Sequence, residues 1–220
     1  MLSYIFMKIL EARPRSYDRR MDRFSRGKVA RIKEAVVAEI PERAEVLEIG
    51  CGTGELAAML IARGATVTGF DLNPEMIEVA REKIEEEGLG NRFTLGEMGV
   101  DGMDLFPSSC FDAVVSTLSF SELSNDERRF TLRHAERVLK PGGLIVIADE
   151  VVPRTLLRKL VKACVRIPML AATYLASGAS TRPIADLPVE IEDAGFEVSK
   201  EIRSQGDAFA LVVGVRKDKE

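Results

Sequence analysis

The sequence predicts a doubly wound α/β fold, in which a mostly parallel sheet carries helices on both faces. Strand-like apolar runs alternate with helix-like segments from residue 46 to residue 148, the pattern of parallel strands joined by crossover helices. The run 144–148 has almost no polar side chains, which is typical of a strand covered on both faces. The tail differs: only Arg203 to Asp207 separate the runs 196–202 and 208–215, too short a connection for a parallel crossover, so the last strand is predicted to be antiparallel.

The elements of the alternating part follow one another closely. The second predicted helix begins at Pro74 and closes at Gly88, the usual asymmetry of helix ends. Ser124 and Glu127 have the spacing of a capping box and start the third helix, which we expect to end at the KPGG sequence of residues 140–143. The predicted strands are 46–49, 65–70, 92–95, 111–116 and 144–148, and the helices are 55–63, 74–87 and the one from Ser124.

Composition bounds the class of protein. The 220 residues, 46% of them hydrophobic, can fill one domain with a full core or at most two small ones. Cys51, Cys110 and Cys164 lie far apart and His134 is the single histidine, which disfavours a metal site or a disulfide framework and indicates a reducing compartment. The amino-terminal segment lacks a basic region and a cleavage site of the secretory type, so we expect a cytoplasmic protein.

Charge is unevenly distributed along the chain. The net charge is −4, yet residues 8–33 hold ten basic side chains against three acidic ones, and residues 151–185 hold six basic ones and no acid. Pro168 should interrupt the second segment, and its wholly apolar part is too short to span a membrane. Three interpretations remain for 151–185: a lid over an acceptor pocket, which is our default, a surface helix at a membrane, or a docking face for a protein.

The stretch VLEIGCGTGELA at residues 46–57 indicates a ligand site. Gly50, Gly52 and Gly54 let the backbone approach a ligand closely, and the helix that follows offers free N–H groups to an anionic group. Glu48 precedes the glycines, which suits a ligand with both a carboxylate and an ammonium. Asp71 stands 21 residues after Gly50 at the end of the second strand, where an acid can accept hydrogen bonds from ribose hydroxyls.

Four motifs in order resemble those of the class I S-adenosylmethionine-dependent methyltransferases. They are ExGxGxG at 48–54, GFDLNPEMIEVAR at 69–81, FDAVVSTLSFSEL at 111–123 and LKPGGLIVIADE at 139–150. The resemblance implies a Rossmann-like seven-stranded sheet with a reversed last strand, S-adenosylmethionine as cofactor and S-adenosylhomocysteine as product. It implies one domain over 1–220, with a helical lid segment at 1–43, a cofactor-binding core at 44–150, an insertion at 151–195 and a terminal hairpin at 196–220.

The resemblance also assigns roles to matching positions. The glycine loop would hold the methionine moiety, with Glu48 near its ammonium and Cys51 as a small side chain beneath it. Tyr17 would close over the cofactor from the lid, although a surface tyrosine packed on the core fits the sequence nearly as well. The implied cofactor-binding residues are Tyr17, Glu48, Gly50, Cys51, Gly52, Gly54, Asp71 and Leu72 at the ribose, Met76, then Glu97, Met98 and Gly99 at the adenine edge, and Ser116 beside the sulfonium.

A closer resemblance involves segments outside the shared motifs. YIFMKILEARPRSYDRRM near the start, GEMGVDGMD after the third strand and ADEVVPRTLLRKLVKACVRIPMLAATYL after the fifth are similar to the corrinoid-protein-associated methyltransferases. The resemblance implies an association with a corrinoid protein and does not itself identify the methyl acceptor.

Methyl transfer from a sulfonium is an in-line displacement, so the protein mainly aligns the reactants and excludes water. A general base is needed only when the acceptor loses a proton. Glu122 and Glu150 are the candidate bases, because each follows a strand at the edge where acceptors bind. A solvated or capping carboxylate is an equal interpretation of Glu122, and Glu150 is the weaker candidate. His134, inside a predicted helix, is expected to be structural or solvated.

Three hypotheses for function follow. The leading one is methyl transfer to an acceptor associated with a corrinoid protein, where reduced cobalt would need no base. The second is a quinone or lipid methyltransferase that contacts a membrane peripherally through 151–185. The third is a cofactor-binding partner of a corrinoid protein without transferase activity. Nucleic acid is not expected as a partner, because Ser116 to Ser119 stand where an NPPY-like tetrapeptide would be and the net charge is negative.

Overall fold

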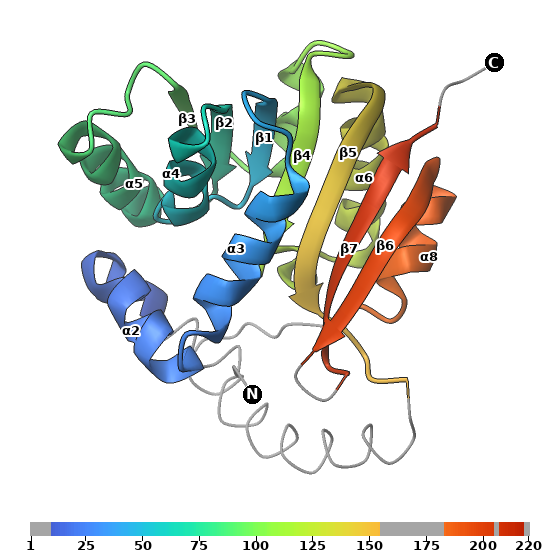
Figure 1. The fold of residues 1–220 in the computed structure, drawn as a ribbon, viewed down its shortest axis with the longest axis horizontal. Helices are drawn as coiled ribbons and strands as arrows, with labels where there is room; N and C mark the ends of the chain where they lie inside the picture. Colours follow the sequence, from blue (N-terminus) through green and yellow to red (C-terminus); the bar gives the residue numbers. More distant parts are fainter. Residues whose placement is uncertain (1–9, 155–182, 205–206, 218–220) are drawn as a thin grey trace.

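The computed structural model describes residues 10–154, 183–204 and 207–217. Its strands form one seven-stranded sheet in the order β3-β2-β1-β4-β5-β7-β6 (Figure 1). The strands are β1 Glu45–Ile49, β2 Thr66–Asp71, β3 Phe93–Glu97, β4 Phe111–Thr117, β5 Leu139–Glu150, β6 Phe196–Ser204 and β7 Phe209–Arg216.

Strand directions confirm the predicted fold class. The pairs β1–β2, β1–β4, β2–β3 and β4–β5 are parallel, whereas β7 is antiparallel to both β5 and β6. The short connection between β6 and β7 therefore joins neighbouring antiparallel strands, as its length predicted. The strand order reverses direction from β1, which places a ligand crevice beyond the carboxyl ends of β1 and β4.

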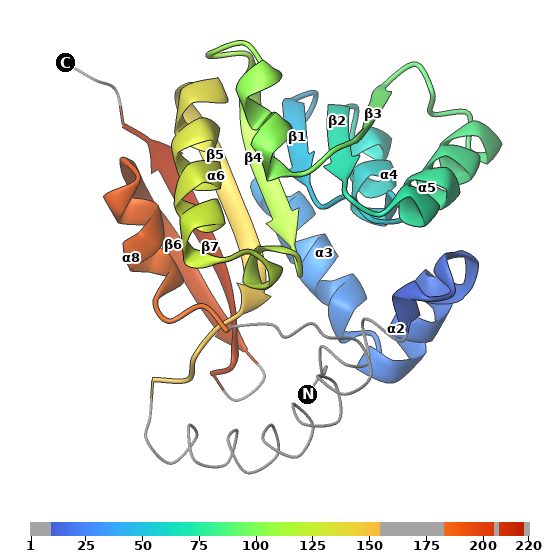
Figure 2. The same cartoon turned by 180° about the vertical axis from the view of Figure 1, so that it is seen from behind.

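Helices cover both faces of the sheet (Figures 1 and 2). Helices α3 and α4 pack on the face that carries Val46, Val115 and Val146, and α6 and α8 pack on the face of Leu47 and Val114. Neighbouring residues of one strand thus enter different cores, as the period of two in a strand requires. The helices are η1 Pro14–Ser16, α2 Tyr17–Ser25, α3 Lys28–Glu39, α4 Glu55–Ala62, α5 Pro74–Glu86, η2 Val100–Leu105, η3 Phe120–Glu122, α6 Asn125–Val138 and α8 Leu187–Asp193.

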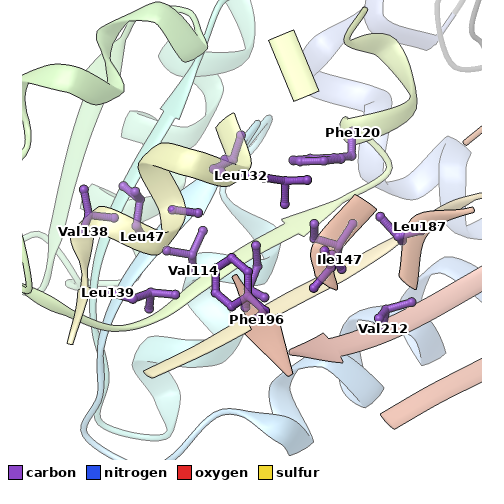
Figure 3. Close-up of a cluster of buried hydrophobic side chains, with 14 of the residues drawn as sticks. Leu47, Val114, Phe120, Leu132, Val138, Leu139, Ile147, Leu187, Phe196 and Val212 are labelled. Carbon is purple, nitrogen blue, oxygen red and sulfur yellow. The ribbon is translucent and has the colours of Figure 1, made fainter. Parts of the chain in front are cut away.

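The larger core lies under α6 and α8. Figure 3 shows its side chains, in which Leu132 of α6 and Leu187 of α8 meet Val114 and Ile147 of the sheet. Phe120, at 0% exposure, anchors η3 in this core. The core therefore fixes the segment after β4, where Glu122 ends η3.

Helix α6, which was predicted to begin at Ser124, ends before the KPGG sequence at which it was expected to stop. Helix α6 finishes at Val138 and β5 already begins at Leu139, which pairs with Phe111. The register shifts between Phe111 and Ala113, and Lys140 binds Asp112 at 2.7 Å. The two glycines thus shape an irregularity inside β5, because tertiary pairing continues the strand across them. The capping box of Ser124 and Glu127 is confirmed.

Helix α8 is an element that the sequence patterns did not predict. It lies within the predicted 151–195 insertion and buries Leu187 and Ile191, which are four residues apart on one face. The apolar basic stretch 155–182 lies outside the described residues, and so does its predicted kink at Pro168. In the part of the chain that the structure describes, no helix is long and apolar enough to cross a membrane.

Candidate active site

The glycine loop joins β1 to α4 at the carboxyl edge of the sheet. The N–H groups of Gly50 and Cys51 donate to the carbonyl of Phe70 at 2.9 and 3.0 Å, so the loop is tied to the end of β2. Gly50, Gly52 and Gly54 have φ of 68°, 52° and 73°. A Cβ on Gly50 would lie 2.5 Å from Cβ and Oγ of Ser119, so only glycine fits this close approach.

A cavity of about 950 Å³ opens beside this loop. Its walls come from α2, α3, the glycine loop, the ends of β2 and β4, the segment after β3, η3 and α6. The volume is in the range of small-molecule sites. The predicted site residues that line it are Tyr17, Glu48, Gly50, Cys51, Gly52, Asp71, Leu72, Met76, Met98, Gly99 and Glu122.

Two predicted residues lie behind the cavity wall. Ser116 is 1% exposed, and its hydroxyl donates to the carbonyl of Ile49 at 3.2 Å and lies 2.8 Å from Oγ of Ser119. Gly54 begins α4, and a Cβ there would meet Cβ of Ala80 at 3.2 Å. In the structure Ser116 links β1 to Ser119, and Gly54 allows close helix packing, while contact of either residue with the cofactor stays a prediction.

Two predicted acids also lie outside the lining. Glu97 is exposed at the end of β3, whereas the next residues, Met98 and Gly99, line the cavity. Glu150 ends β5 opposite Phe209 of β7 and is not among the lining residues. The structure therefore favours Glu122 over Glu150 as the carboxylate that an acceptor could reach.

Glu48 is the most unusual group of the cavity. It is 2% exposed, and its Oε2 has no hydrogen-bond partner among the described residues. Burial raises the pKa of Glu48 to about 8, although the nearby Lys33 opposes the shift. A buried carboxylate oxygen without a donor is costly, so this position fits a cationic group of a ligand.

Asp71 ties the end of β2 to two neighbouring segments. Its Oδ2 accepts from the N–H of Gly52 at 2.9 Å, and its Oδ1 accepts from the N–H of Asn73 at 2.9 Å. A carboxylate has about four acceptor positions, so capacity remains for hydroxyl groups of a ligand. Asp71 therefore shapes the glycine loop as well as facing the cavity.

The amino-terminal helices close one side of the cavity. Asp18 of α2 accepts from the hydroxyl of Thr53 at 2.6 Å and from Nζ of Lys83 at 2.6 Å. These two bonds fix α2 against the glycine loop and α5, and they place Tyr17 in the cavity wall. Burial, then the charges of Glu11 and Asp18, raises the pKa of Tyr17, so its hydroxyl stays protonated.

The sequence patterns missed part of the lining. Lys33, Leu118, Ser119, Leu123 and Phe130 also line the cavity. Leu118 and Ser119 stand in the motif after the fourth strand, which was a usable signal. Lys33 and Phe130 come from α3 and α6, whose approach to the loop depends on tertiary packing.

Comparison with known proteins identifies the family. Residues 46–143 match the methyltransferase domain family. A demethylmenaquinone methyltransferase of Tropheryma whipplei is 31% identical over 180 residues, which cover 76% of this chain and 72% of that protein. A phosphatidylethanolamine N-methyltransferase of Cereibacter sphaeroides is 38% identical over 143 residues, covering 64% of this chain and 68% of that one.

Solved structures agree with these relatives. An O-methyltransferase family protein from Burkholderia thailandensis superposes with a TM-score of 0.70 at 25% identity, covering 94% of this chain and 60% of that one. The chain belongs to the class I S-adenosylmethionine-dependent methyltransferases. It is thus an enzyme that uses S-adenosylmethionine, and the hypothesis of a partner without transferase activity is set aside.

The cavity of this methyltransferase fits its cofactor. Glu48, with its buried oxygen, would face the ammonium, and the bare backbone at Gly50 would lie along the methionine moiety. Asp71 would accept from the ribose hydroxyls. When bound, S-adenosylmethionine supplies an electrophilic methyl group. The chain itself supplies a buried acid, a loop tied to β2 and helix α2, whose Tyr17 lines the cavity.

Neither Cys51 nor His134 has the surroundings of a reactive group. Cys51 is 5% exposed, and burial raises the pKa of its thiol, so it is a neutral small side chain in the cavity wall. The ring of His134 packs 4.2 Å from that of Phe130, and burial lowers its pKa. His134 is thus half-buried against Phe130 and is not among the residues that line the cavity.

Proposed function

We propose that the enzyme methylates a lipid-type small molecule, either a quinol ring or a lipid headgroup, at a membrane surface. The two curated relatives described above carry the names of a quinone and a phospholipid methyltransferase. Neither name refers to a corrinoid. The comparisons therefore support the second hypothesis from the sequence over the leading one.

The observation that carries the proposal is the apolar part of the cavity lining. Leu118, Leu123 and Phe130 contribute apolar side chains, and Glu122 lies between them on η3. Apolar side chains beside the carboxylate of Glu122 suit a flat or aliphatic acceptor that loses a proton on methylation. Reduced cobalt would need no such carboxylate.

Proton removal is the chemical role proposed for Glu122. Its carboxylate is exposed on the cavity side of η3, while the neighbouring Ser121 is buried and held by Asp149. The backbone under Glu122 is thus fixed, which aligns a base without burying its charge. Tyr17, kept protonated, can donate a hydrogen bond to an acceptor oxygen.

The test uses labelled S-adenosylmethionine with three acceptors: a short-chain demethylmenaquinol, a short-chain phosphatidylethanolamine and a purified corrinoid protein with reduced cobalt. We expect label in one of the first two. Glu122→Gln should lower that transfer about 100-fold or more, with cofactor affinity unchanged. Asp126→Asn is the matched control, because Asp126 lines the same wall and its salt bridge to Arg129 is exposed.

Other outcomes have definite meanings. Label in the corrinoid alone, surviving Glu122→Gln, would replace this proposal by the leading hypothesis from the sequence. Equal losses of methyl transfer in Glu122→Gln and Asp126→Asn would show that the negative charge of the cavity wall matters, and would contradict the role of Glu122 as a general base. Transfer to neither lipid-type acceptor, with cofactor still bound, would overturn the proposed substrate class.

A further inference from the structure

The surface from the residue before η1, along α2, to the start of α3 is strongly basic. Five side chains there are exposed and form no ion pair with any described residue: Arg13, Arg19, Arg23, Arg26 and Lys28. We call these five side chains the arginine face. The whole protein has a net charge of −4, so this face opposes the overall charge.

The acids of the same segment mostly point inward. Asp18 binds Thr53 and Lys83, and Glu11 is half-buried and lines the cavity. Asp22 is the acid of α2 that remains on the exposed side. Basic side chains thus outnumber acidic ones on the exposed side of α2, where Asp22 stands between Arg19 and Arg26.

The arginine face lies next to the cavity. Tyr17 of α2 and both Val29 and Lys33 of α3 line the cavity, so the same two helices carry the wall and the basic surface. In both views α2 lies at the edge of the sheet where the parallel strands end (Figures 1 and 2). A flat anionic surface against α2 would therefore lie beside the cavity wall that Tyr17, Val29 and Lys33 form.

We propose that the arginine face docks the enzyme on anionic lipid headgroups and so delivers a membrane-borne acceptor to the cavity. The inference rests on the proposed function, because only a lipid-type acceptor requires this contact. Charge complementarity identifies the partner. A nucleic acid fits less well. Its phosphates would be repelled by the exposed carboxylates of Glu122, Asp126 and Glu127 if the polymer reached into the cavity.

The expected binding has a characteristic size and salt dependence. Each basic residue close to an anionic bilayer strengthens partition by a factor of about five. Salt screens exposed charges beyond about 8 Å at physiological ionic strength, so binding should weaken steeply as salt increases. Arg19→Glu combined with Arg23→Glu should lower partition at least about 20-fold.

The experiment is co-sedimentation of the full chain with phosphatidylcholine vesicles over a range of salt concentrations. One set of vesicles also contains about 30 mol% of the anionic lipid phosphatidylglycerol. The control variant combines Arg133→Glu with Lys217→Glu, which makes the same change of charge. Arg133 and Lys217 are both exposed. Lys217 follows β7, which runs antiparallel to β5 and therefore ends where the parallel strands begin, at the end of the sheet away from α2. Binding of S-adenosylmethionine verifies that each variant is folded.

We expect salt-sensitive binding to anionic vesicles that the α2 variant loses and the control variant keeps. The inference is overturned if vesicles do not bind, if neutral vesicles bind equally, if both variants bind alike, or if only RNA competes for the face. Transfer to short-chain acceptors without vesicles separates the two proposals. Normal transfer with no vesicle binding rejects the docking alone, whereas no transfer to either acceptor rejects the proposed function.

Discussion

The backbone N–H of Ser121 donates to Oδ2 of Asp149 at 2.9 Å, and this bond joins η3 to the end of β5. Asp149 is 1% exposed, and its Oδ1 accepts from the N–H of Glu150. Both carboxylate oxygens thus receive backbone donors. Asp149 is a positioning residue for the wall that carries Glu122.

Asp149→Asn should impair transfer to the acceptor while leaving cofactor affinity unchanged. An amide offers one oxygen, so one of the two N–H donors would face an NH₂ group and lose its bond, at a cost of about 1–3 kcal/mol. Steady-state kinetics should show kcat/KM for the acceptor lowered about 5- to 100-fold. A parallel loss of cofactor affinity would contradict a role confined to the acceptor wall.

The pH dependence of the native enzyme tests the same contact. Burial raises the pKa of Asp149 to about 6. A raised acid pKa favours the folded state at low pH, and this contribution is lost as pH rises from about 4 to 6. Activity should change in the opposite sense: protonation below pH about 6 puts a proton on an oxygen that must accept, so kcat/KM should fall there. If kcat/KM of the Asp149→Asn variant fell equally steeply at low pH, the fall would be due to a group other than Asp149.

Cofactor binding should release a proton near pH 7. The pKa of Glu48 is about 8 without cofactor, so this group is mostly protonated at neutral pH. An ammonium beside Oε2 would stabilise the carboxylate, so affinity should rise from pH 6 toward 8, near the pKa of Glu48. Calorimetry in two buffers with different ionisation enthalpies measures the released proton. Glu48→Gln should bind more weakly and release none; an equal release by the variant would remove Glu48 from this role.

The stability of the cofactor-free protein should respond to the same group. Because the folded-state pKa of Glu48 exceeds its unfolded value, its contribution to stability declines as pH rises from about 4.5 to about 8. Glu48→Gln removes that decline, so at pH 8 the variant should be the more stable by a few kcal/mol, with about 5 as an upper bound. Denaturant unfolding at pH 5 and pH 8 measures the difference. Parallel curves for the two proteins would contradict it.

Gly50→Ala should abolish cofactor binding, whereas Gly52→Ala should only weaken it. The new Cβ at residue 50 would collide with Ser119 at 2.5 Å, but a Cβ at residue 52 has no atom within 4 Å. Both sites have positive φ, so both variants carry a backbone cost of about 1–2 kcal/mol. The difference in Kd between the variants thus isolates the collision. Equal affinities would show that Ser119 moves aside.

Asp18→Ala should weaken the attachment of α2 to the glycine loop and to α5. The change removes the acceptor of Thr53 and of Lys83, so α2 loses its two bonds to the loop and α5. We expect cofactor Kd to rise about 5- to 100-fold, from one or two lost charge-assisted bonds, and limited proteolysis within α2 to accelerate. Asp22→Ala is the matched control, because Asp22 is exposed on the same helix. Similar proteolysis of both variants would contradict the anchoring role of Asp18.

The sequence predicted the core of the site because its signals are local. Glu48, Gly50, Gly52 and Asp71 belong to short motifs at strand ends, and parallel strands bring their carboxyl ends to one edge. The sequence did not predict that Ser116 is covered, since the side-chain period of a strand decides only between the two faces of the sheet. Whether a side chain faces a cavity depends on what packs above it, here Ser119.

By itself, the sequence determined the alternating order of strands and helices from β1 to β5, the reversed last strand and the glycine loop between β1 and α4. Those features follow from hydrophobic period, connection length and glycine spacing, which act over a few residues. Only the tertiary structure decided that Asp18 holds Thr53, that Asp149 holds Ser121 and that Glu150 lies outside the cavity. These relationships join residues 28 or more positions apart, and a contact of that separation is fixed by how whole elements pack, which no local pattern encodes.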